Sequence, residues 1–173
     1  MIIVYTGDGK GKTEAAFGLA LRAVGTGLKT AIVQFMKTEE WWSGERNAIR
    51  LYSIPIDIYI MGAGFSWDRP KGFKSHEESA KKAWEKVKSL IRKGMEIIIC
   101  DEINVALKLG FLNINEVCSL IESSFKERKD RHICMTGRDA PKDILEISDY
   151  VTEFVEVKHP FSKGIKAIKG IDY

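Results

Sequence analysis

Two lysines, two threonines, three glycines and one aspartate make up the stretch of this chain with the plainest chemical meaning, Thr6-Gly7-Asp8-Gly9-Lys10-Gly11-Lys12-Thr13. It follows a short apolar run at residues 2–5 and leads into an alanine-rich run at residues 15–24. A strand, a glycine loop and a helix in this order are the context in which the pattern G-x-x-x-x-G-K-[ST] marks a phosphate-binding loop. Thr6 stands where the pattern has its first glycine, and Gly7 and Gly9 supply the flexibility one and three positions later.

The composition of this loop follows from the way proteins bind phosphate. Glycines let the backbone turn tightly, so that successive N–H groups point into one concavity that suits an anion. The N-terminus of the following helix adds partial positive charge, Lys12 adds a full charge, and the Thr13 hydroxyl is placed to hold a Mg²⁺ ion. A glycine turn with incidental lysines would not require all these features to agree. The residues that we expect to bind a polyphosphate are Gly7, Asp8, Gly9, Lys10, Gly11, Lys12 and Thr13.

Two acids, Asp101 and Glu102, end the apolar run at residues 96–100. An apolar strand that ends in acids is the usual companion of a phosphate loop, because one acid positions the metal ion and the other is available for charge or proton work. This generic pattern makes Asp101 the first choice as the metal partner. The alternative is that both acids cap the next helix.

Polar side chains also follow two other apolar runs. Gln34 and Lys37 stand at the end of residues 30–35, and Arg138 follows residues 132–135. Because ligands gather at the carboxyl ends of the strands in open α/β sheets, we expect these side chains at the same rim as the phosphate loop.

The sequence allows two interpretations for each of three further residues. Arg22 is the one charged residue of an otherwise apolar helical run at residues 15–24, so it either lies near an anionic ligand or extends to the surface. Phe65 and Trp67 stand in the glycine-rich loop at residues 62–68. They either form an exposed apolar surface that needs a partner or fold back onto the core.

The bulk composition excludes several classes of protein. The 173 residues suffice for one domain, 1–173, with 45% hydrophobic and 29% charged residues, as in globular proteins. A net charge of +3 is too small to indicate nucleic acid as the main partner. No apolar run is long enough to span a membrane and no signal peptide is recognisable, so we expect a cytoplasmic protein. The three cysteines are far apart, which argues against a disulfide framework or a zinc site.

Strand and helix patterns alternate along the chain. The alternation predicts a single three-layer α/β domain with a mainly parallel sheet. Strands are expected at residues 2–5, 30–35, 54–60, 96–100, 132–135 and, as an edge strand, 150–157. Helices are expected at residues 15–24, from 44 onwards, 75–93 with Ser75 and Glu78 as a capping box, 113–125 and 141–147.

In its motifs the whole chain resembles the ATP:corrinoid adenosyltransferases of the phosphate-loop type. The resemblance implies a P-loop NTPase-like (RecA-like) fold. It rests on several short strings in one order and spacing, each weak by itself. Besides the phosphate loop they are residues 33–37 (VQFMK), 44–47 (GERN), 64–67 (GFSW), 101–102 (DE), 136–138 (TGR), 157–159 (VKH) and 170–173 (GIDY).

The resemblance implies a reaction unlike that of a kinase. In such enzymes a cobalt(I) corrinoid attacks the 5′-carbon of ATP, the 5′-deoxyadenosyl group is transferred, and the whole triphosphate leaves. Lys12, Glu102 and Arg138 would be catalytic, and the metal, Mg²⁺ or Mn²⁺, would lie between Thr13 and Glu102 rather than on Asp101. Arg22 and Gln34 would join the loop in binding ATP. The implied corrinoid-binding residues are Phe65, Trp67 and Arg46.

The implied setting is adenosylcobalamin biosynthesis or salvage, with a flavin-type electron-donor protein and a homodimer. Asp8 and Glu14 depart from the family, where asparagine and a second threonine are common, and the chain begins at its first strand. The alternative functions are a generic P-loop NTPase or small-molecule kinase and a non-enzymatic carrier of ATP or a corrinoid. A kinase would not need Phe65 and Trp67.

Overall fold

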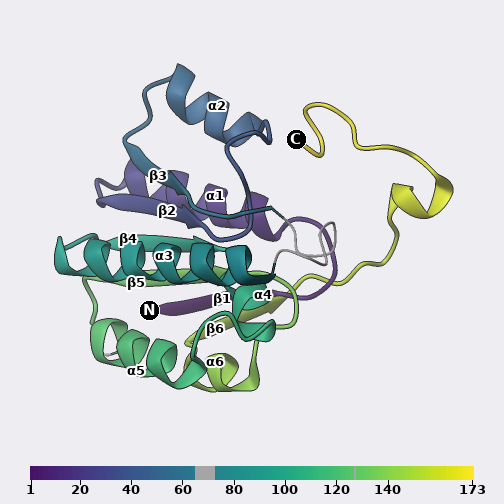
Figure 1. Cartoon of the computed structure of the whole chain (residues 1–173). Coiled ribbons are helices and arrows are strands. Elements are labelled where there is room, and N and C mark those ends of the chain that lie inside the picture. The colour runs from purple at the N-terminus through teal and green to yellow at the C-terminus, as the bar shows by residue number, and fades with distance from the viewer. Residues whose placement is uncertain (65–72, 127) are drawn as a thin grey trace.

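Six parallel strands form one sheet in the order β3-β2-β4-β5-β1-β6. The structure is a computed structural model that describes residues 1–64, 73–126 and 128–173. An all-parallel sheet with helices on both faces is the three-layer α/β arrangement expected from the sequence, and it is consistent with a P-loop NTPase-like fold (Figure 1). The strands are β1 Ile2–Thr6, β2 Thr30–Gln34, β3 Ile56–Ile60, β4 Ile97–Asp101, β5 His132–Thr136 and β6 Tyr150–Glu153.

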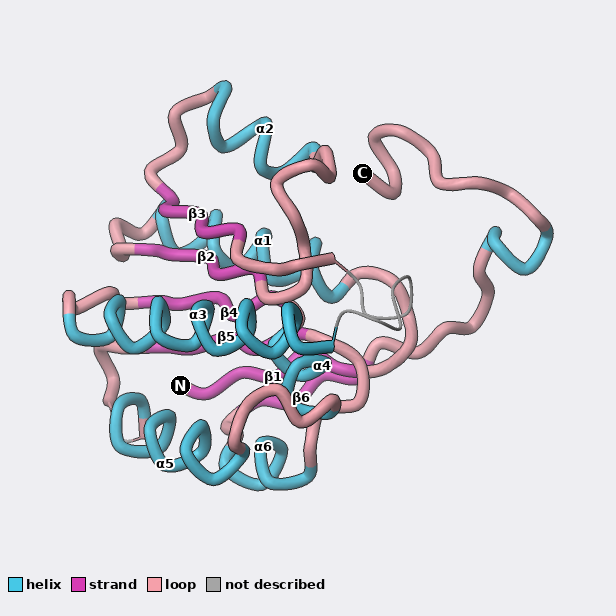
Figure 2. Tube along the Cα trace, viewed as in Figure 1, coloured by secondary structure: helices cyan, strands magenta, loops and turns pink. Residues whose placement is uncertain are grey.

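The helices divide between the two faces of the sheet. One face carries α1, and the other carries α3 and α5 with the short α4 and α6, as the tube view also shows (Figure 2). The helices are α1 Lys12–Gly25, α2 Gly44–Leu51, α3 Phe73–Arg92, α4 Ile103–Lys108, α5 Ile114–Phe125 and α6 Lys142–Ile147, followed by a 3₁₀ turn at Pro160–Lys163.

The central strands are buried on both sides, which explains their continuous apolar sequences. In β4, Ile98 and Cys100 belong to the core beneath α3 and α5, whereas Ile97 and Ile99 belong to the core beneath α1. Alternate residues of a strand point to opposite faces, so a strand covered on both faces needs apolar residues at every position. The strand at the edge, β6, is exposed along its whole length.

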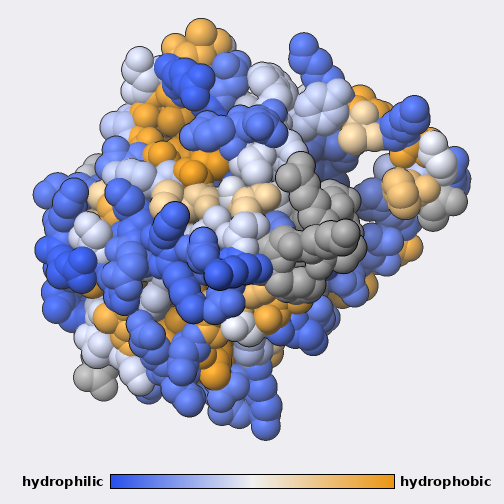
Figure 3. Space-filling view, in the orientation of Figure 1, coloured by the Kyte–Doolittle hydropathy of each residue, from blue (hydrophilic) through white to orange (hydrophobic). Residues whose placement is uncertain are grey.

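Several expected boundaries move in the structure. Helix α3 begins at Phe73 rather than Ser75, so Ser75 is not its N-cap, and β6 ends at Glu153 rather than at residue 157. Helix α4 and the 3₁₀ turn, of six and four residues, were not expected from the sequence. The outward face of α3 is covered by hydrophilic side chains, as its sequence pattern predicts (Figure 3). None of the described helices is long and apolar enough to cross a membrane.

Helix α1 is less buried than its apolar sequence suggests. Only one of its faces packs on the sheet, through Ala16, Phe17, Ala20 and Ala23, while Leu21 is exposed. A helix in an outer layer contacts the sheet along one stripe, so the small residues on that stripe set how closely it approaches.

The fold gathers the carboxyl ends of the strands at one edge. In the register of the sheet, Gln34 of β2 lies beside Asp101 of β4, and Tyr5 of β1 lies beside Thr136 of β5. Polar residues that are far apart in the sequence therefore meet where β2, β4, β5 and β1 end.

Beyond the sheet, the segments that follow β2 and β3 continue side by side. Gly62 N donates to Lys37 O at 3.1 Å, and Met61 N donates to Gln34 O at 3.0 Å. A Cβ atom on Gly62 would stand 2.3 Å from the carbonyl carbon of Met36. The chain after β2 keeps its course only because residue 62 lacks a side chain.

We predict that Gly62→Ala lowers the free energy of unfolding by roughly 2 kcal/mol, because backbone must move to admit the methyl group. Urea denaturation measures the change. Gly18→Ala is the matched control, since Gly18 is an exposed position of α1 with no atom within 4 Å of the added carbon. That substitution should raise stability by about 0.5–1 kcal/mol through helix propensity. Equal stability of Gly62→Ala and the wild type would contradict the steric argument.

Candidate functional site

The phosphate loop lies between β1 and α1 and rests on the chain that follows β6. Gly9 N donates to Phe154 O at 2.7 Å. A Cβ atom would stand 2.4 Å from this same oxygen if placed on Gly7 and 2.8 Å from it if placed on Gly9. Both glycines are therefore required by close backbone contact, and Gly7 also has a φ of +91°.

Lys12 is the first residue of α1 and its side chain curls back into the loop. Its Nζ donates to the carbonyl oxygens of Gly7 at 2.6 Å and Gly9 at 2.7 Å. Burial lowers the pKa of Lys12, and the nearby Glu102 opposes this shift. The lysine is thus held at the centre of the loop by neutral acceptors that a phosphate group can replace.

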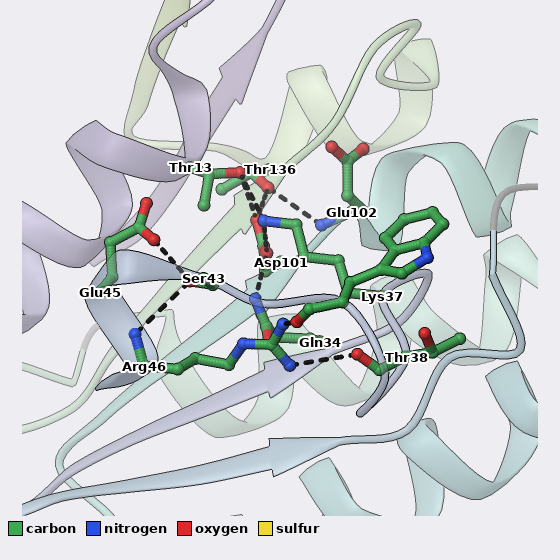
Figure 4. Close-up of polar contacts among 11 residues, drawn as sticks. Thr13, Gln34, Lys37, Thr38, Ser43, Glu45, Arg46, Asp101, Glu102 and Thr136 are labelled. Carbon is green, nitrogen blue, oxygen red and sulfur yellow. Dashed lines mark hydrogen bonds and ion pairs between the residues drawn. The ribbon is translucent and has the colours of Figure 1, made fainter. Parts of the chain in front are cut away.

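Asp101, at the end of β4, is fully buried and accepts contacts from four side chains (Figure 4). Its Oδ1 accepts from Thr13 Oγ1 at 3.0 Å and from Thr136 Oγ1 at 2.9 Å. Its Oδ2 accepts from Gln34 Nε2 at 2.9 Å and lies 3.1 Å from Lys37 Nζ. Burial by itself would raise the pKa of Asp101, but these partners together hold it below the usual value.

Glu102 follows in the left-handed conformation, with a φ of +66°, and precedes α4 without capping it through its side chain. Its backbone N–H donates to Thr136 Oγ1 at 2.9 Å, so Thr136 contacts both acids. Burial and then the charge of Asp101 raise the pKa of Glu102 to about 7, against the opposing effect of Lys37 and Lys12. Unlike Asp101, it lines the cavity described below.

These oxygens suit a hard cation such as Mg²⁺ or Mn²⁺, which prefers carboxylate and hydroxyl ligands. Thr13 and Glu102 both line the cavity, and either could bind an ion there. Asp101 does not line the cavity, and its contacts are with protein side chains, among them the Thr13 hydroxyl. Its geometry is that of a residue that positions Thr13, which favours Glu102 over the generic choice of Asp101 as a ligand.

The remaining cations at the loop are each beside a carboxylate. Arg138 Nε lies 3.7 Å from Asp8 Oδ1, and its Nη2 donates to the Asp8 carbonyl at 3.2 Å. Lys10 pairs with Glu14 one turn further on. Asp8 and Glu14 therefore offset the charges of the two exposed cations of the site.

A cavity of about 840 Å³ extends from the phosphate loop to the segment before α2. From the residues predicted at the sequence level it brings together Asp8, Gly9, Lys10, Gly11, Lys12, Thr13, Arg46, Glu102 and Arg138. Residues with no predicted role also line it, namely Glu40, Trp41, Trp42, Ser43, Glu45, Val105, Glu156, Asp172 and Tyr173, of which Glu45, Asp172 and Tyr173 lie in the motif strings. The closing Asp172-Tyr173 could have been found from the family motif, but no physical signal in the sequence pointed to a site there.

The structure does not bring every predicted residue to this cavity. Gln34 is fully buried and contacts Asp101, so it supports the site without lining it. Arg22 is exposed in the last turn of α1, at the end opposite Lys12, which makes it a surface residue of this chain. About three helical turns of α1 separate Arg22 from the loop, so in the single chain it does not line the cavity, and its expected part in binding ATP stays a prediction.

Arg46 is buried and braces the segment before its helix. It donates to Thr38 O at 3.1 Å and to Trp41 O, and its backbone N–H donates to the N-cap Ser43. It lines the cavity as well, so it both shapes the wall and presents charge to it. Phe65 and Trp67, the predicted aromatic pair, lie outside the described residues.

The pKa of Glu102 predicts how stability depends on pH when no divalent ion is bound. Its folded pKa of about 7 exceeds the ordinary 4.5, so its contribution to stability is lost as the pH rises from 4.5 to 7. Glu102→Gln should therefore be more stable than the wild type at pH 8 in EDTA, by roughly 1–3 kcal/mol. The advantage should vanish below pH 4.5. Thermal unfolding at several pH values measures it, with exposed Glu146→Gln as the control, and a constant difference across this range would refute the assignment.

Comparison with known proteins shows the family to which the chain belongs. The family model described as "ATP:corrinoid adenosyltransferase BtuR/CobO/CobP" matches residues 1–173. The chain is similar to the corrinoid adenosyltransferase of Sinorhizobium sp, with 39% identity over all of this chain and 80% of that protein. It is also similar to that of Escherichia coli K12, with 37% identity over all of this chain and 85% of the other, and to that of Pseudomonas aeruginosa, with 35% identity over all of this chain and 83% of the other.

Full-length matches of this kind agree with a phosphate loop, a paired Asp-Glu strand end and a large cavity at one edge of a parallel sheet. The chain belongs to the ATP:corrinoid adenosyltransferase family, whose members are enzymes that transfer adenosyl groups.

Proposed function

We propose that this enzyme transfers the 5′-deoxyadenosyl group of ATP to the cobalt(I) of a corrinoid and releases triphosphate. The observation that carries the proposal is the convergence of Lys12, Thr13, Glu102 and Arg138 on one cavity at the phosphate loop. Adenosylcobalamin biosynthesis or salvage in the cytoplasm is the corresponding role.

The chemistry requires little of the protein besides binding and charge. Cobalt(I) supplies the electron pair of the new cobalt–carbon bond, and the C5′–O bond breaks with its pair on the triphosphate. The nucleophile is strong and needs no general base, whereas the leaving group needs its developing charge stabilised. The loop amides, Lys10, Lys12 and Arg138 surround the place where that charge develops.

The charges around the cavity favour a divalent cation as a further component. Seven carboxylates line the cavity against five lysine and arginine side chains, so a triphosphate meets no excess of positive charge. A Mg²⁺ or Mn²⁺ ion, held by Thr13 and Glu102, would neutralise phosphate oxygens. Because Glu102 must lose its proton to bind a cation, metal affinity would rise as the pH passes through 7.

The corrinoid side of the proposal rests on the family resemblance. Phe65 and Trp67 would pack against the lower face of the corrin and displace its lower ligand, which makes cobalt(II) easier to reduce. Arg46, buried at the cavity wall, would also contact the corrinoid. A flavin-type protein would supply the electron, and the enzyme would act as a homodimer on cobalamin or an a,c-diamide precursor.

An anaerobic assay with ATP, Mg²⁺ and chemically reduced cob(I)alamin tests the reaction. The expected products are a light-sensitive adenosyl-corrinoid, followed by its absorbance spectrum, and one equivalent of triphosphate, identified by phosphorus NMR. ADP or phosphate with an unchanged corrinoid would favour an NTPase or kinase instead. Tight binding of both substrates without turnover would favour a carrier.

Lys12→Ala should lower the rate of adenosyl transfer at least about 100-fold, because it removes a cation from the leaving triphosphate. Initial rates under saturating ATP measure the loss. Lys81→Ala, which removes an exposed lysine of α3, is the control and should leave the rate unchanged. Near-normal activity of Lys12→Ala would rule out the phosphate-loop assignment.

Trp67→Ala should impair the reaction that starts from cobalt(II) more than the reaction of chemically pre-reduced cobalt(I). The reason is that lower-face packing assists reduction, and a pre-reduced corrinoid no longer needs that assistance. Parallel rate measurements on the two substrates test this difference. Equal losses on both would show that Trp67 does not act through the lower ligand.

A further inference from the structure

The stretch that follows β6 leaves the body of the protein and returns to it. Each residue from 160 to 173 whose burial the structure describes is exposed. The chain arches outward, passes through the 3₁₀ turn at Pro160–Lys163, and comes back to the first turn of α2 (Figures 1 and 3). A segment with so little buried surface is held mainly by the contacts at its far end.

The side-chain contacts of that end are made with Trp42 and Lys10, which both line the cavity. The rings of Tyr173 and Trp42 meet edge to face, with centroids 6.0 Å apart and planes at 90°. Lys169 Nζ lies 5.9 Å from the centroid of the Trp42 ring, and Asp172 Oδ1 lies 3.9 Å from Lys10 Nζ. The returning segment thus connects the phosphate loop to the segment before α2, on opposite sides of the cavity.

The segment arrives as a formed turn. Ile168 N donates to Asp172 Oδ2 at 2.8 Å, and Gly170 N donates to Tyr173 O at 2.9 Å. Gly170 has a φ of +81°, which a residue without a Cβ adopts at least cost. We call residues 168–173 the strap. Its internal hydrogen bonds fix the directions in which Asp172 and Tyr173 point.

We propose, on the basis of the function proposed above, that the strap is part of the ATP site and that Tyr173 and Trp42 hold the adenine base. The phosphate loop takes the triphosphate at one end of the cavity, so the nucleoside must occupy another part of its wall. Trp42 and Tyr173 are about half exposed, at 50% and 46%, and both line the cavity. Two aromatic rings at right angles offer a flat face and an edge, a geometry that suits a flat base.

Asp172 has a separate role in the same site, as a counter-ion that ATP replaces. Lys10 of the phosphate loop stands between two carboxylates, that of Glu14 in α1 and that of Asp172 in the strap. A triphosphate approaching the loop competes with both for the lysine. The strap therefore lowers phosphate affinity through Asp172 while it raises nucleoside affinity through Tyr173, which favours ATP over free triphosphate.

The test compares binding of Mg²⁺-ATP with binding of Mg²⁺-tripolyphosphate, measured by calorimetry without a corrinoid. Tyr173→Ala and Trp42→Ala should each weaken ATP binding about tenfold and should not weaken tripolyphosphate binding. Tyr52→Ala is the matched control, because Tyr52 is an exposed aromatic of the α2 C-cap that does not line the cavity. Circular dichroism and thermal unfolding confirm that each variant is folded.

Unchanged ATP affinity in a folded Tyr173→Ala variant would overturn the base-binding role. An increase confined to the KM for the corrinoid would overturn it too, since the rings would then bind corrin. A wild-type chain that binds ATP but forms no adenosyl-corrinoid would refute the proposed function alone, and the comparison of the two phosphate ligands would still decide the role of the strap.

Asp172→Asn tests the counter-ion role, because asparagine keeps an oxygen to accept from Ile168 N but removes the charge. This variant should bind tripolyphosphate and ATP several-fold more tightly, with the larger gain at low salt. Glu146→Gln, at an exposed acid that pairs with Lys142, is the control and should change neither affinity. Weaker or unchanged tripolyphosphate binding by Asp172→Asn would refute the proposal that phosphate replaces Asp172 as the counter-ion of Lys10.

Discussion

A single buried carboxylate, that of Asp101, is the constraint on which the rest of the site depends. An ionised group without solvent is tolerated only where partners surround it, and here they come from four places in the chain. Gln34 ends β2, Lys37 follows it, Thr136 ends β5 and Thr13 opens α1. The order β2-β4-β5 in the sheet is what brings these side chains to one carboxylate.

The neighbouring acid is controlled by the same arrangement but in the opposite direction. Asp101 accepts the side-chain hydrogen bonds and forms the ion pair with Lys37. Its negative charge then adds to the effect of burial in raising the pKa of Glu102. Two adjacent acids thus acquire different properties from their surroundings alone. One stays ionised and fixes the Thr13 hydroxyl, and the other faces the cavity and is ready to exchange its proton for a cation.

The sequence predicted the features that depend on local pattern. The phosphate loop, the buried central strands, the edge position of β6 and the strand-end location of Asp101 and Glu102 are all confirmed. Local pattern left the position of one residue open. Arg22 interrupts an apolar run as a ligand-binding arginine would, yet its position along α1 places it far from the loop. The position of a residue along a helix, rather than its type, decides how far its side chain lies from a ligand at the helix N-terminus.

What the sequence could not predict are contacts between segments with no pattern of their own. The carbonyl oxygen of Phe154 lies so close to Gly7 and Gly9 that neither position has room for a Cβ atom. Nothing in the residue type of Phe154 predicts this contact. The strap reaches Lys10 and Trp42 only because the chain after β6 crosses the same edge of the sheet as the loop does. Since β6 pairs with β1, the chain that leaves β6 must emerge beside the phosphate loop. The strand pairing therefore explains why the segment after the last strand both supports the loop and lines the cavity above it.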